Sequence, residues 1–347
     1  MSSDKKPIVL ITGVTGYIGS HVCRLFLEKS DQYQVRGSVR NVTSAKSLAT
    51  LQEALGEELL AKLELVPLEL TNPDQFAEAV KGVQYVVHVA SPFPAVNPKD
   101  ENLVIQPALE GTLNMLKAAS KEASVQRVCV TSSNYASFLM DLEDKANYPK
   151  LVDERCWSDE TLPYLDPYQK SKIIAEKAAW KYYEEEKPSY TLTTVLPGYV
   201  MGPPLASKMT GNSIGFGIGV LTGESKIFPR MGFPLSDVRD VAQAHVNAVE
   251  KDDAQGLRFC LSSESQRLSD LAQHLKTAVG DAYDISTQEM DEESGKQAVG
   301  PFWDLFPVYN TERSVKVLGM EYTPVSKTMA DMATALIEKG YVEDKRN

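Results

Sequence analysis

A glycine-rich turn directly after the first apolar segment sets the strongest limit on the fold of this chain. Residues 8–12 form a short, mostly apolar run, and Gly13, Gly16 and Gly19 follow at intervals of three as a helical pattern begins. Glycine permits a tight turn and a close approach of the backbone to a ligand, and the start of the next helix offers free N–H groups to a phosphate. This order of strand, turn and helix predicts a first βαβ unit that binds the pyrophosphate of a dinucleotide.

Short apolar runs alternate with helical patterns through the first two-thirds of the chain. The expected strands are residues 8–12, 34–39, 63–68, 85–90, 127–132 and 192–196. The expected helices between them are residues 21–29, 45–55, 73–80, 103–121 and 168–186. Parallel strands need crossover connections, and continuously apolar strands have both faces covered. The pattern therefore predicts the α/β class, with a Rossmann-type doubly wound parallel sheet that binds ligands at the carboxyl ends of its strands.

The alternation loosens after Pro197. Residues 201–236 are rich in Gly, Pro and Ser without a strong period, and residues 281–310 read as irregular and aromatic. Further helices are expected at residues 237–250, 268–279 and about 325–339, with one strand at residues 257–262. We expect a dinucleotide-binding domain of residues 1–200 and about 237–262, and a smaller, discontinuous C-terminal substrate-binding lobe of about 201–236 and 263–347.

Composition argues against several other classes of protein. The formal net charge of the 347 residues is −11 and no block of lysine and arginine occurs, so nucleic-acid and membrane-surface partners are not expected. No apolar run approaches the roughly 20 residues of a membrane-spanning helix, and the first seven residues lack the apolar core of a signal peptide. The histidines and the four cysteines are too scattered for a metal site. We expect a cytoplasmic enzyme with no metal, either monomeric or homodimeric, in which Cys23 and Cys129 are buried thiols.

The end of the second strand indicates which dinucleotide is bound. In proteins that use NAD, an acidic residue about 20 positions past the glycines usually binds the ribose hydroxyls. Here Arg40 ends that strand and Lys46 follows it. A guanidinium suits a ribose 2′-phosphate and would leave the ribose of NAD without an acceptor. These residues favour NADP(H); the alternative is that both belong to a solvated loop face.

Tyr168 and Lys172 open a helical stretch downstream of the strand 127–132. Residues four apart share one face of a helix, so this spacing puts an ammonium beside a phenol. A unit charge about 5 Å away, at an effective dielectric constant of about 20, is worth roughly 3 kcal/mol, so we expect Lys172 to lower the pKa of Tyr168. Such a phenol can donate a proton to a developing alkoxide. The same spacing recurs at two other places, Tyr183/Lys187 and Tyr341/Lys345, so it identifies nothing by itself.

Several longer segments accompany the glycine turn, Ser133 and Tyr168/Lys172. They are Val35–Arg40 (VRGSVR), Val87–Pro92 (VHVASP), Glu110–Leu113 (EGTL), Thr131–Ser133 (TSS), Asp153–Ser158 (DERCWS), Ala175–Trp180 (AEKAAW) and Pro197–Val200 (PGYV). Together they resemble the dihydroflavonol reductase-like group of the extended short-chain dehydrogenases/reductases, which includes cinnamoyl-CoA reductases and yeast methylglyoxal and aldehyde reductases. The resemblance covers residues 8 to about 260 well and the remainder loosely.

The resemblance, with the arguments from glycine and charge above, implies a set of site residues. Ser133, Tyr168 and Lys172 would be the catalytic residues. The cofactor-binding residues would be Thr12, Gly13, Gly16, Tyr17, Ile18, Gly19, Arg40, Lys46, Glu69, Leu70, Ala90, Ser91, Tyr168, Lys172, Pro197 and Val200. Phe93, Phe138 and Tyr164 are the best candidates by position for an apolar substrate pocket, ahead of Pro94, Tyr199, Phe216, Phe302 and Trp303.

The chain also departs from the group's pattern. Asn134 and Tyr135 follow Ser133 where small residues are common, Phe138 stands where plant dihydroflavonol reductases carry a polar residue, and Ala108 replaces an Asn of sugar-nucleotide epimerases. These departures favour a general NADPH-dependent reductase of aldehydes or ketones, with Tyr168 as proton donor. Two alternatives stay open: a sugar-nucleotide epimerase or dehydratase with tightly bound NAD, and a non-catalytic protein that senses the cofactor.

Overall fold

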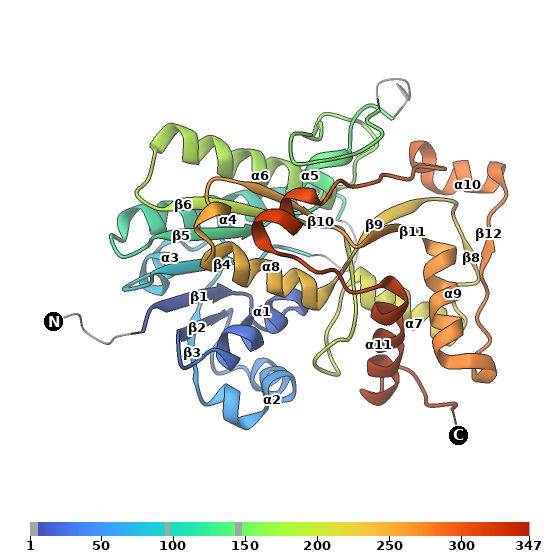
Figure 1. Ribbon diagram of the computed structural model, residues 1–347, viewed down its shortest axis with the longest axis horizontal. Coiled ribbons are helices and arrows are strands. Elements are labelled where there is room, and N and C mark those ends of the chain that lie inside the picture. Colours follow the sequence, from blue (N-terminus) through green and yellow to red (C-terminus); the bar gives the residue numbers. More distant parts are fainter. Residues whose placement is uncertain (1–5, 94–97, 143–147, 347) are drawn as a thin grey trace.

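A seven-stranded parallel sheet forms the centre of the protein. The computed structural model describes residues 6–93, 98–142 and 148–346, shown in Figure 1. The strands are β1 (Ile8–Thr12), β2 (Gln34–Val39), β3 (Leu63–Pro67), β4 (Tyr85–His88), β5 (Arg127–Thr131), β6 (Thr191–Pro197) and β10 (Arg258–Leu261). They lie in the order β10-β6-β5-β4-β1-β2-β3, and every neighbouring pair is parallel. The predicted doubly wound sheet is therefore confirmed.

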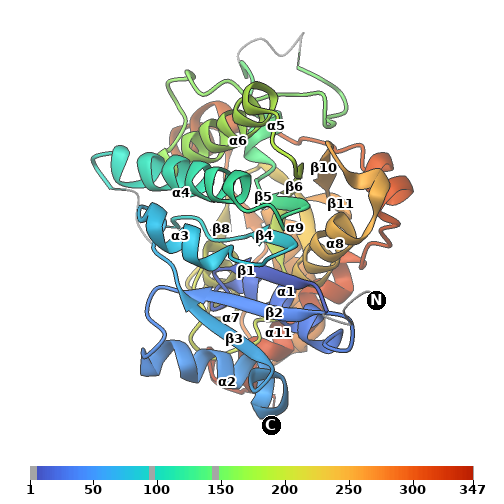
Figure 2. The same cartoon turned by 90° about the vertical axis from the view of Figure 1, so that its left-hand side faces the viewer.

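Helices cover both faces of this sheet (Figure 2). One face packs against α1 (Tyr17–Glu28), α2 (Ala45–Leu60) and α8 (Val238–Glu250), and the other against α3 (Pro73–Ala79), α4 (Asn102–Lys121) and α6 (Pro167–Glu186). The side chains of β1 alternate between the two layers: Val9 and Ile11 join the first apolar cluster, and Ile8 and Leu10 the second. Each such buried aliphatic side chain contributes about 1.5–3 kcal/mol, so covering both faces is a main source of stability.

The start of α6 is encoded in consecutive residues. Asp166 accepts a hydrogen bond from the backbone N–H of Gln169 at 2.8 Å, and the Gln169 side chain accepts one from the N–H of Asp166 at 3.0 Å. This reciprocal capping satisfies two backbone donors, and Pro167 occupies the first turn, where its missing N–H is not needed. The cap fixes Tyr168 in the first turn of the helix and Lys172 one turn later.

Most remaining elements lie at the other end of the molecule (Figure 1). The short strands β7 (Tyr199–Met201), β9 (Gly232–Asp237) and β11 (Glu264–Arg267) form a second sheet, and β8 (Ile227–Phe228) pairs with β12 (Gln288–Glu289). The helices here are α7 (Asn212–Thr222), α9 (Leu268–Val279), α10 (Glu292–Val299) and α11 (Val325–Glu338), whereas α5 (Tyr135–Phe138) follows β5. The division into two domains stays a prediction.

Two helices lie in segments that the sequence pattern gave as irregular. α7 contains Gly215, Gly217 and Gly219, which obscure a helical period, yet the packing requires a small residue: a Cβ at Gly217 would lie 2.7 Å from Leu336 Cδ1 on α11. In α10, a Cβ at Gly295 would overlap the Trp303 ring. These glycines permit close packing between elements, a requirement that consecutive residues do not reveal.

The structure bears on three expectations drawn from composition: buried thiols, membrane-spanning helices and metal sites. All four cysteines are free, and Cys23 and Cys129 are buried, as predicted. Within the ranges described above, no helix combines the length and the apolar character needed to cross a bilayer. Nor do the His, Cys, Asp and Glu side chains of those ranges gather in groups of three that would hold a metal ion.

Candidate active site

The glycine turn forms a cradle at the carboxyl end of β1. Gly13 has φ +72°, a conformation that favours glycine, and the N–H of Gly16 donates to its carbonyl oxygen at 2.9 Å. A Cβ at Gly19 would lie only 2.2 Å from that oxygen, so this turn tolerates no side chain there. Gly16 is the N-cap residue of α1 and has no side chain to cap the first N–H groups of the helix. These open donors and the close backbone packing fit the pyrophosphate of a dinucleotide.

Thr12 connects the end of β1 to the end of β4. Its hydroxyl oxygen accepts hydrogen bonds from the N–H groups of Val89 at 3.0 Å and Ala90 at 2.9 Å, and lies 3.0 Å from Nδ1 of His88. Burial lowers the pKa of His88 to about 3, so the ring is neutral and Nδ1 can accept the remaining hydroxyl hydrogen. The Thr12 side chain thus holds Ala90, whose Cα would lie 3.2 Å from a Cβ at Gly13, against the cradle.

The residues that the sequence assigns to the adenosine end follow β2 and β3. Arg40 comes directly after β2 and Lys46 lies in the first turn of α2; both side chains are exposed, and neither forms an ion pair with another described residue. Two free cations at this edge fit a phosphate group. Glu69 is exposed after β3, and Leu70 packs against Gly111 of α4.

Four other predicted cofactor residues border the cradle or the second sheet. Tyr17 and Ile18 form the first turn of α1, and the Tyr17 hydroxyl donates to the carbonyl oxygen of Gly202 at 2.6 Å. Ser91 follows β4 and is partly buried, and Val200 lies in β7. Tyr17 thereby ties the glycine turn to the segment after β7.

Ser133 lies at the carboxyl end of β5 and is only 7% exposed. Its Oγ donates to Asn134 Oδ1 at 3.0 Å and accepts from the N–H of Tyr135 at 3.2 Å. The N–H of Asn134 donates to the carbonyl oxygen of Pro197 at 2.9 Å. Ser133 and Pro197, which the sequence placed in the site from separate segments, are therefore brought together at neighbouring strand ends.

Tyr168 and Lys172 share one face of α6, as predicted, with 5.8 Å between the Lys172 Nζ and the centroid of the Tyr168 ring. Burial lowers the pKa of Lys172 to about 8, against the opposing effect of Glu176. The expectation that Lys172 lowers the pKa of Tyr168 is wrong for this structure: burial raises that pKa above its usual value. The spacing in the sequence predicts the effect of the Lys172 charge, whereas the desolvation of Tyr168 depends on the folded structure. Among the described residues, neither the phenol oxygen nor the ammonium forms a hydrogen bond, so both have donors for a ligand.

Two aromatic rings pack against Tyr168. The ring of Phe93 lies nearly perpendicular to it with 4.9 Å between centroids, and the ring of Tyr135 does so at 6.2 Å. The Phe93 side chain is 45% exposed. Burial raises the pKa of the Tyr135 phenol to about 12. The sequence showed Tyr135 as a departure from the group and gave it no role. The structure puts its ring at the proposed reaction centre.

The other predicted pocket residues lie deeper. Phe138 is 2% exposed and packs beneath Tyr135 with 5.7 Å between ring centroids. The Tyr164 hydroxyl donates to the carbonyl oxygen of Met140 at 2.7 Å, and its ring packs on Phe302. Of the candidates weighed from sequence, Pro94 lies outside the described residues.

Glu176 is a buried residue of this region that the sequence interpretation assigned no role. It lies four residues after Lys172 and is 2% exposed. The spacing that relates Tyr168 to Lys172 also relates Lys172 to Glu176, so one further step along the helix face would have found it.

A parallel sheet with a glycine cradle after its first strand is typical of dinucleotide-dependent oxidoreductases, and the relatives of this chain place it in that class. The chain belongs to the NAD dependent epimerase/dehydratase family, which matches residues 9–259, and within it to the extended short-chain dehydrogenases/reductases. The predicted relation to the dihydroflavonol reductase-like group is confirmed by its relatives.

Three of these relatives show how far the similarity extends. Tetraketide alpha-pyrone reductase 1 of Arabidopsis thaliana is 32% identical over 343 residues, 96% of each chain. Cinnamoyl-CoA reductase 1 of Petunia hybrida is 32% identical over 344 residues, 99% of this chain and 96% of that protein. Yeast methylglyoxal/isovaleraldehyde reductase, solved in complex with NADPH, superposes with a TM-score of 0.78 at 29% identity, covering 96% of this chain and 100% of the other.

Proposed function

We propose that this protein is an NADPH-dependent reductase that converts an aldehyde or ketone to the alcohol. The observation that carries the proposal is the pair of the partly buried Tyr168 and the buried Lys172, whose polar groups form no hydrogen bond with another described residue, on the helix that packs beside Ser133. A phenol, a cation and a hydroxyl at the carboxyl ends of parallel strands are the groups needed to protonate a developing alkoxide.

NADPH is favoured over NADH by charge. Arg40 and Lys46 are exposed beside the second strand end without ion-pair partners in the described chain, and a guanidinium can bind a 2′-phosphate through two hydrogen bonds. The structural relative from yeast is complexed with NADPH. Gly13 and Gly19 leave room for the pyrophosphate, and Lys172 can donate to a ribose hydroxyl.

When bound, NADPH supplies the hydride that reaches the carbonyl carbon. Tyr168 donates its phenolic proton to the carbonyl oxygen, which completes the alcohol and leaves a phenolate that solvent must reprotonate. The burial that raises the pKa of Tyr168 keeps the phenol protonated at neutral pH, the state that a proton donor needs. The cation of Lys172 then stabilises the phenolate that forms.

Ser133 binds the carbonyl oxygen from the strand end. In this structure its hydroxyl hydrogen points to Asn134, so it must rotate toward the substrate. Phe93 and Tyr135 flank Tyr168 with apolar ring surface, which favours a substrate with an apolar or aromatic group beside the carbonyl. Phe138 packs against Tyr135 and supports this wall.

The test is the loss of reduced-nicotinamide absorbance when the protein is mixed with NADPH or NADH and a panel of aldehydes and ketones. We expect net consumption of NADPH, faster than that of NADH. An absence of turnover on every carbonyl compound would refute the reductase. A sugar-nucleotide epimerase would instead copurify with NAD and consume no net NADPH.

A further inference from the structure

A buried carboxylate lies directly behind the Ser-Tyr-Lys group. Glu176, on α6, accepts a hydrogen bond from Ser132 Oγ at 2.6 Å on one oxygen and from Thr194 Oγ1 at 2.8 Å on the other. Ser132 precedes Ser133 in the chain, and its N–H donates to the carbonyl oxygen of Val195 at 2.8 Å. The carboxylate therefore fixes the strand end that carries Ser133.

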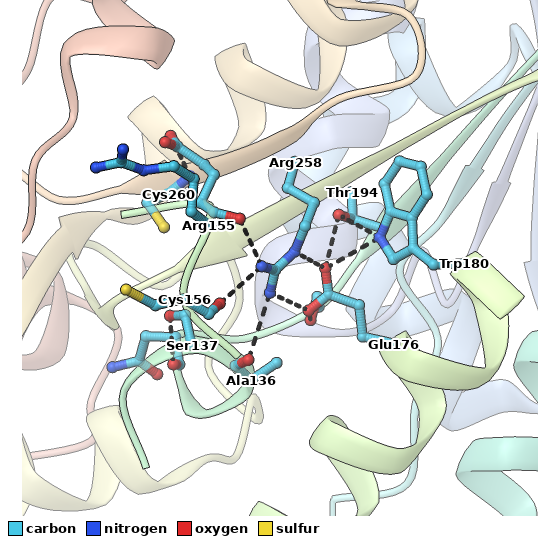
Figure 3. A network of polar contacts seen from close by, with 12 residues as sticks. Ala136, Ser137, Arg155, Cys156, Glu176, Trp180, Thr194, Arg258 and Cys260 are labelled. Atoms are coloured by element: carbon cyan, nitrogen blue, oxygen red, sulfur yellow. Dashed lines mark hydrogen bonds and ion pairs between the residues drawn. The ribbon is translucent and has the colours of Figure 1, made fainter. Parts of the chain in front are cut away.

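Arg258 of β10 forms an ion pair with this carboxylate (Figure 3). Its Nε donates to one oxygen of Glu176 at 2.9 Å, and its second terminal nitrogen to the other at 3.2 Å. The remaining donors reach the carbonyl oxygens of Glu154 at 2.7 Å, Cys156 at 2.8 Å and Ala136 at 3.3 Å. All five guanidinium donors are thus used, and the Trp157 ring covers the group at 3.6 Å. Only arginine can make this set of contacts.

Lys172 lies on the face of α6 that carries Glu176, one turn earlier. Glu176 is the charged group that favours the ammonium form of Lys172. The ammonium in turn acts on His88 of β4, whose pKa is lowered first by burial and then by the charge of Lys172, so that ring stays neutral. Glu176 is therefore the negative charge that opposes the desolvation of Lys172. A buried ion pair gives little net stability, because desolvation offsets the attraction, so stability alone explains the Glu176–Arg258 pair poorly.

We propose that Glu176 is a positioning residue for the reductase site, held by Arg258: its carboxylate fixes Ser132 beside Ser133 and provides the negative charge that keeps Lys172 cationic. The proposal rests on the proposed function for its kinetic part. Its electrostatic part concerns the protein without substrate and can be tested whatever the reaction is.

The electrostatic test follows the free energy of unfolding against pH for the wild type and Lys172→Met. The difference between them begins to change near the pKa of Lys172 in the folded protein. In a Glu176→Gln background we expect this onset to move to lower pH by at least one unit. Glu250→Gln is the matched control, because Glu250 binds Lys29 and Tyr33 away from the site. An unchanged onset in Glu176→Gln would overturn the proposal.

Glu176→Gln leaves Arg258 without its counter-charge and could prevent folding. The double variant Glu176→Gln/Arg258→Gln removes both charges, and in it we expect a smaller shift of the onset in the same direction. An onset at the wild-type pH, or at higher pH, in the double variant would contradict the proposal as well.

The kinetic test uses Ser132→Ala, which removes one hydrogen bond and no charge. We expect kcat for carbonyl reduction to fall about tenfold, with KM changed less than twofold, because the substrate contacts stay. Ser132→Thr, which keeps a hydroxyl, should restore most of kcat. A wild-type kcat in Ser132→Ala would refute the positioning of Ser133. If the wild type reduces no carbonyl compound, the proposed function fails, while the unfolding test still decides whether Glu176 acts on Lys172.

Discussion

The ammonium nitrogen of Lys172 lies 5.8 Å from the centroid of the Tyr168 ring, one turn along the same helix, and the lysine side chain is buried. Burial shifts the two groups in opposite directions: it raises the pKa of Tyr168 and lowers that of Lys172 to about 8. Both shifts disfavour the charged form, as desolvation requires. At neutral pH the site therefore holds a protonated phenol beside a cation that is close to losing its proton.

The lowered pKa of Lys172 predicts a stability that depends on pH. The ordinary value is 10.5, so between about pH 8 and 10.5 the unfolded chain binds more protons than the folded one. The wild type should gain stability relative to Lys172→Met as pH rises through this window, by at most about 3.4 kcal/mol. Denaturant unfolding at a series of pH values measures the gain. A difference that stays flat from pH 7 to 11 would contradict the burial of a charged lysine.

Replacing the proposed proton donor should stop the reaction without emptying the cofactor site. Tyr168→Phe removes one oxygen from a partly buried ring, so we expect kcat to fall at least about a hundredfold. The affinity for NADPH, measured by fluorescence titration, should change less than threefold. Tyr183→Phe, at the far end of α6, is the control. Turnover that survives in Tyr168→Phe would assign the proton to another group.

The cofactor preference should depend on the exposed cation after β2. Arg40→Ala should weaken NADPH binding about tenfold or more, because a charge-assisted hydrogen bond to the 2′-phosphate is lost, and should leave NADH binding nearly unchanged. Arg24→Ala is the control, because Arg24 is a surface arginine that pairs with Glu28 of its own helix. Equal losses for the two dinucleotides would remove Arg40 from the phosphate site.

The cradle should reject a methyl group at one glycine more strongly than at its neighbour. A Cβ at Gly19 would lie 2.2 Å from the carbonyl oxygen of Gly13, whereas a Cβ at Gly16 would lie 3.2 Å from the same oxygen. Gly19→Ala should therefore cost about 1–3 kcal/mol of stability and abolish measurable NADPH binding. Gly16→Ala should reduce both the stability and the NADPH affinity by less. Unfolding curves and NADPH titrations compare the two variants directly.

Tyr135 should restrict the size of the substrate. Its ring flanks Tyr168, so Tyr135→Ala should raise kcat/KM for bulky ketones relative to small aldehydes by about tenfold, an effect of roughly 1.4 kcal/mol. Tyr135→Phe keeps the ring and should keep the wild-type ratio. If Tyr135→Ala lowered both values equally, the ring would serve packing and would not select the substrate.

Consecutive residues are enough to predict the sheet, the cradle and the spacing of Tyr168 and Lys172. The apolar runs at Ile8–Thr12 and Gln34–Val39 match β1 and β2 to the residue, because strand pattern and glycine turn are written in consecutive positions. The start of α6 is likewise local, since Asp166, Pro167 and Gln169 form its cap within four residues. Once the cap sets the start of the helix, Tyr168 and Lys172 lie on one face of it because they are four residues apart.

The groups that surround Tyr168 and Lys172 come from segments far apart in the chain. Arg258 reaches Glu176 across 82 residues, and Thr12 reaches His88 across 76. No periodicity in either segment specifies such a pair. The direction in which the pKa of Tyr168 shifts also depends on the fold. A charge at a known helical spacing can be predicted from sequence, whereas desolvation depends on every group packed around the ring. The order of residues along the chain shows which chemical groups are present. Their ionisation and their hydrogen-bond partners depend on packing between distant segments.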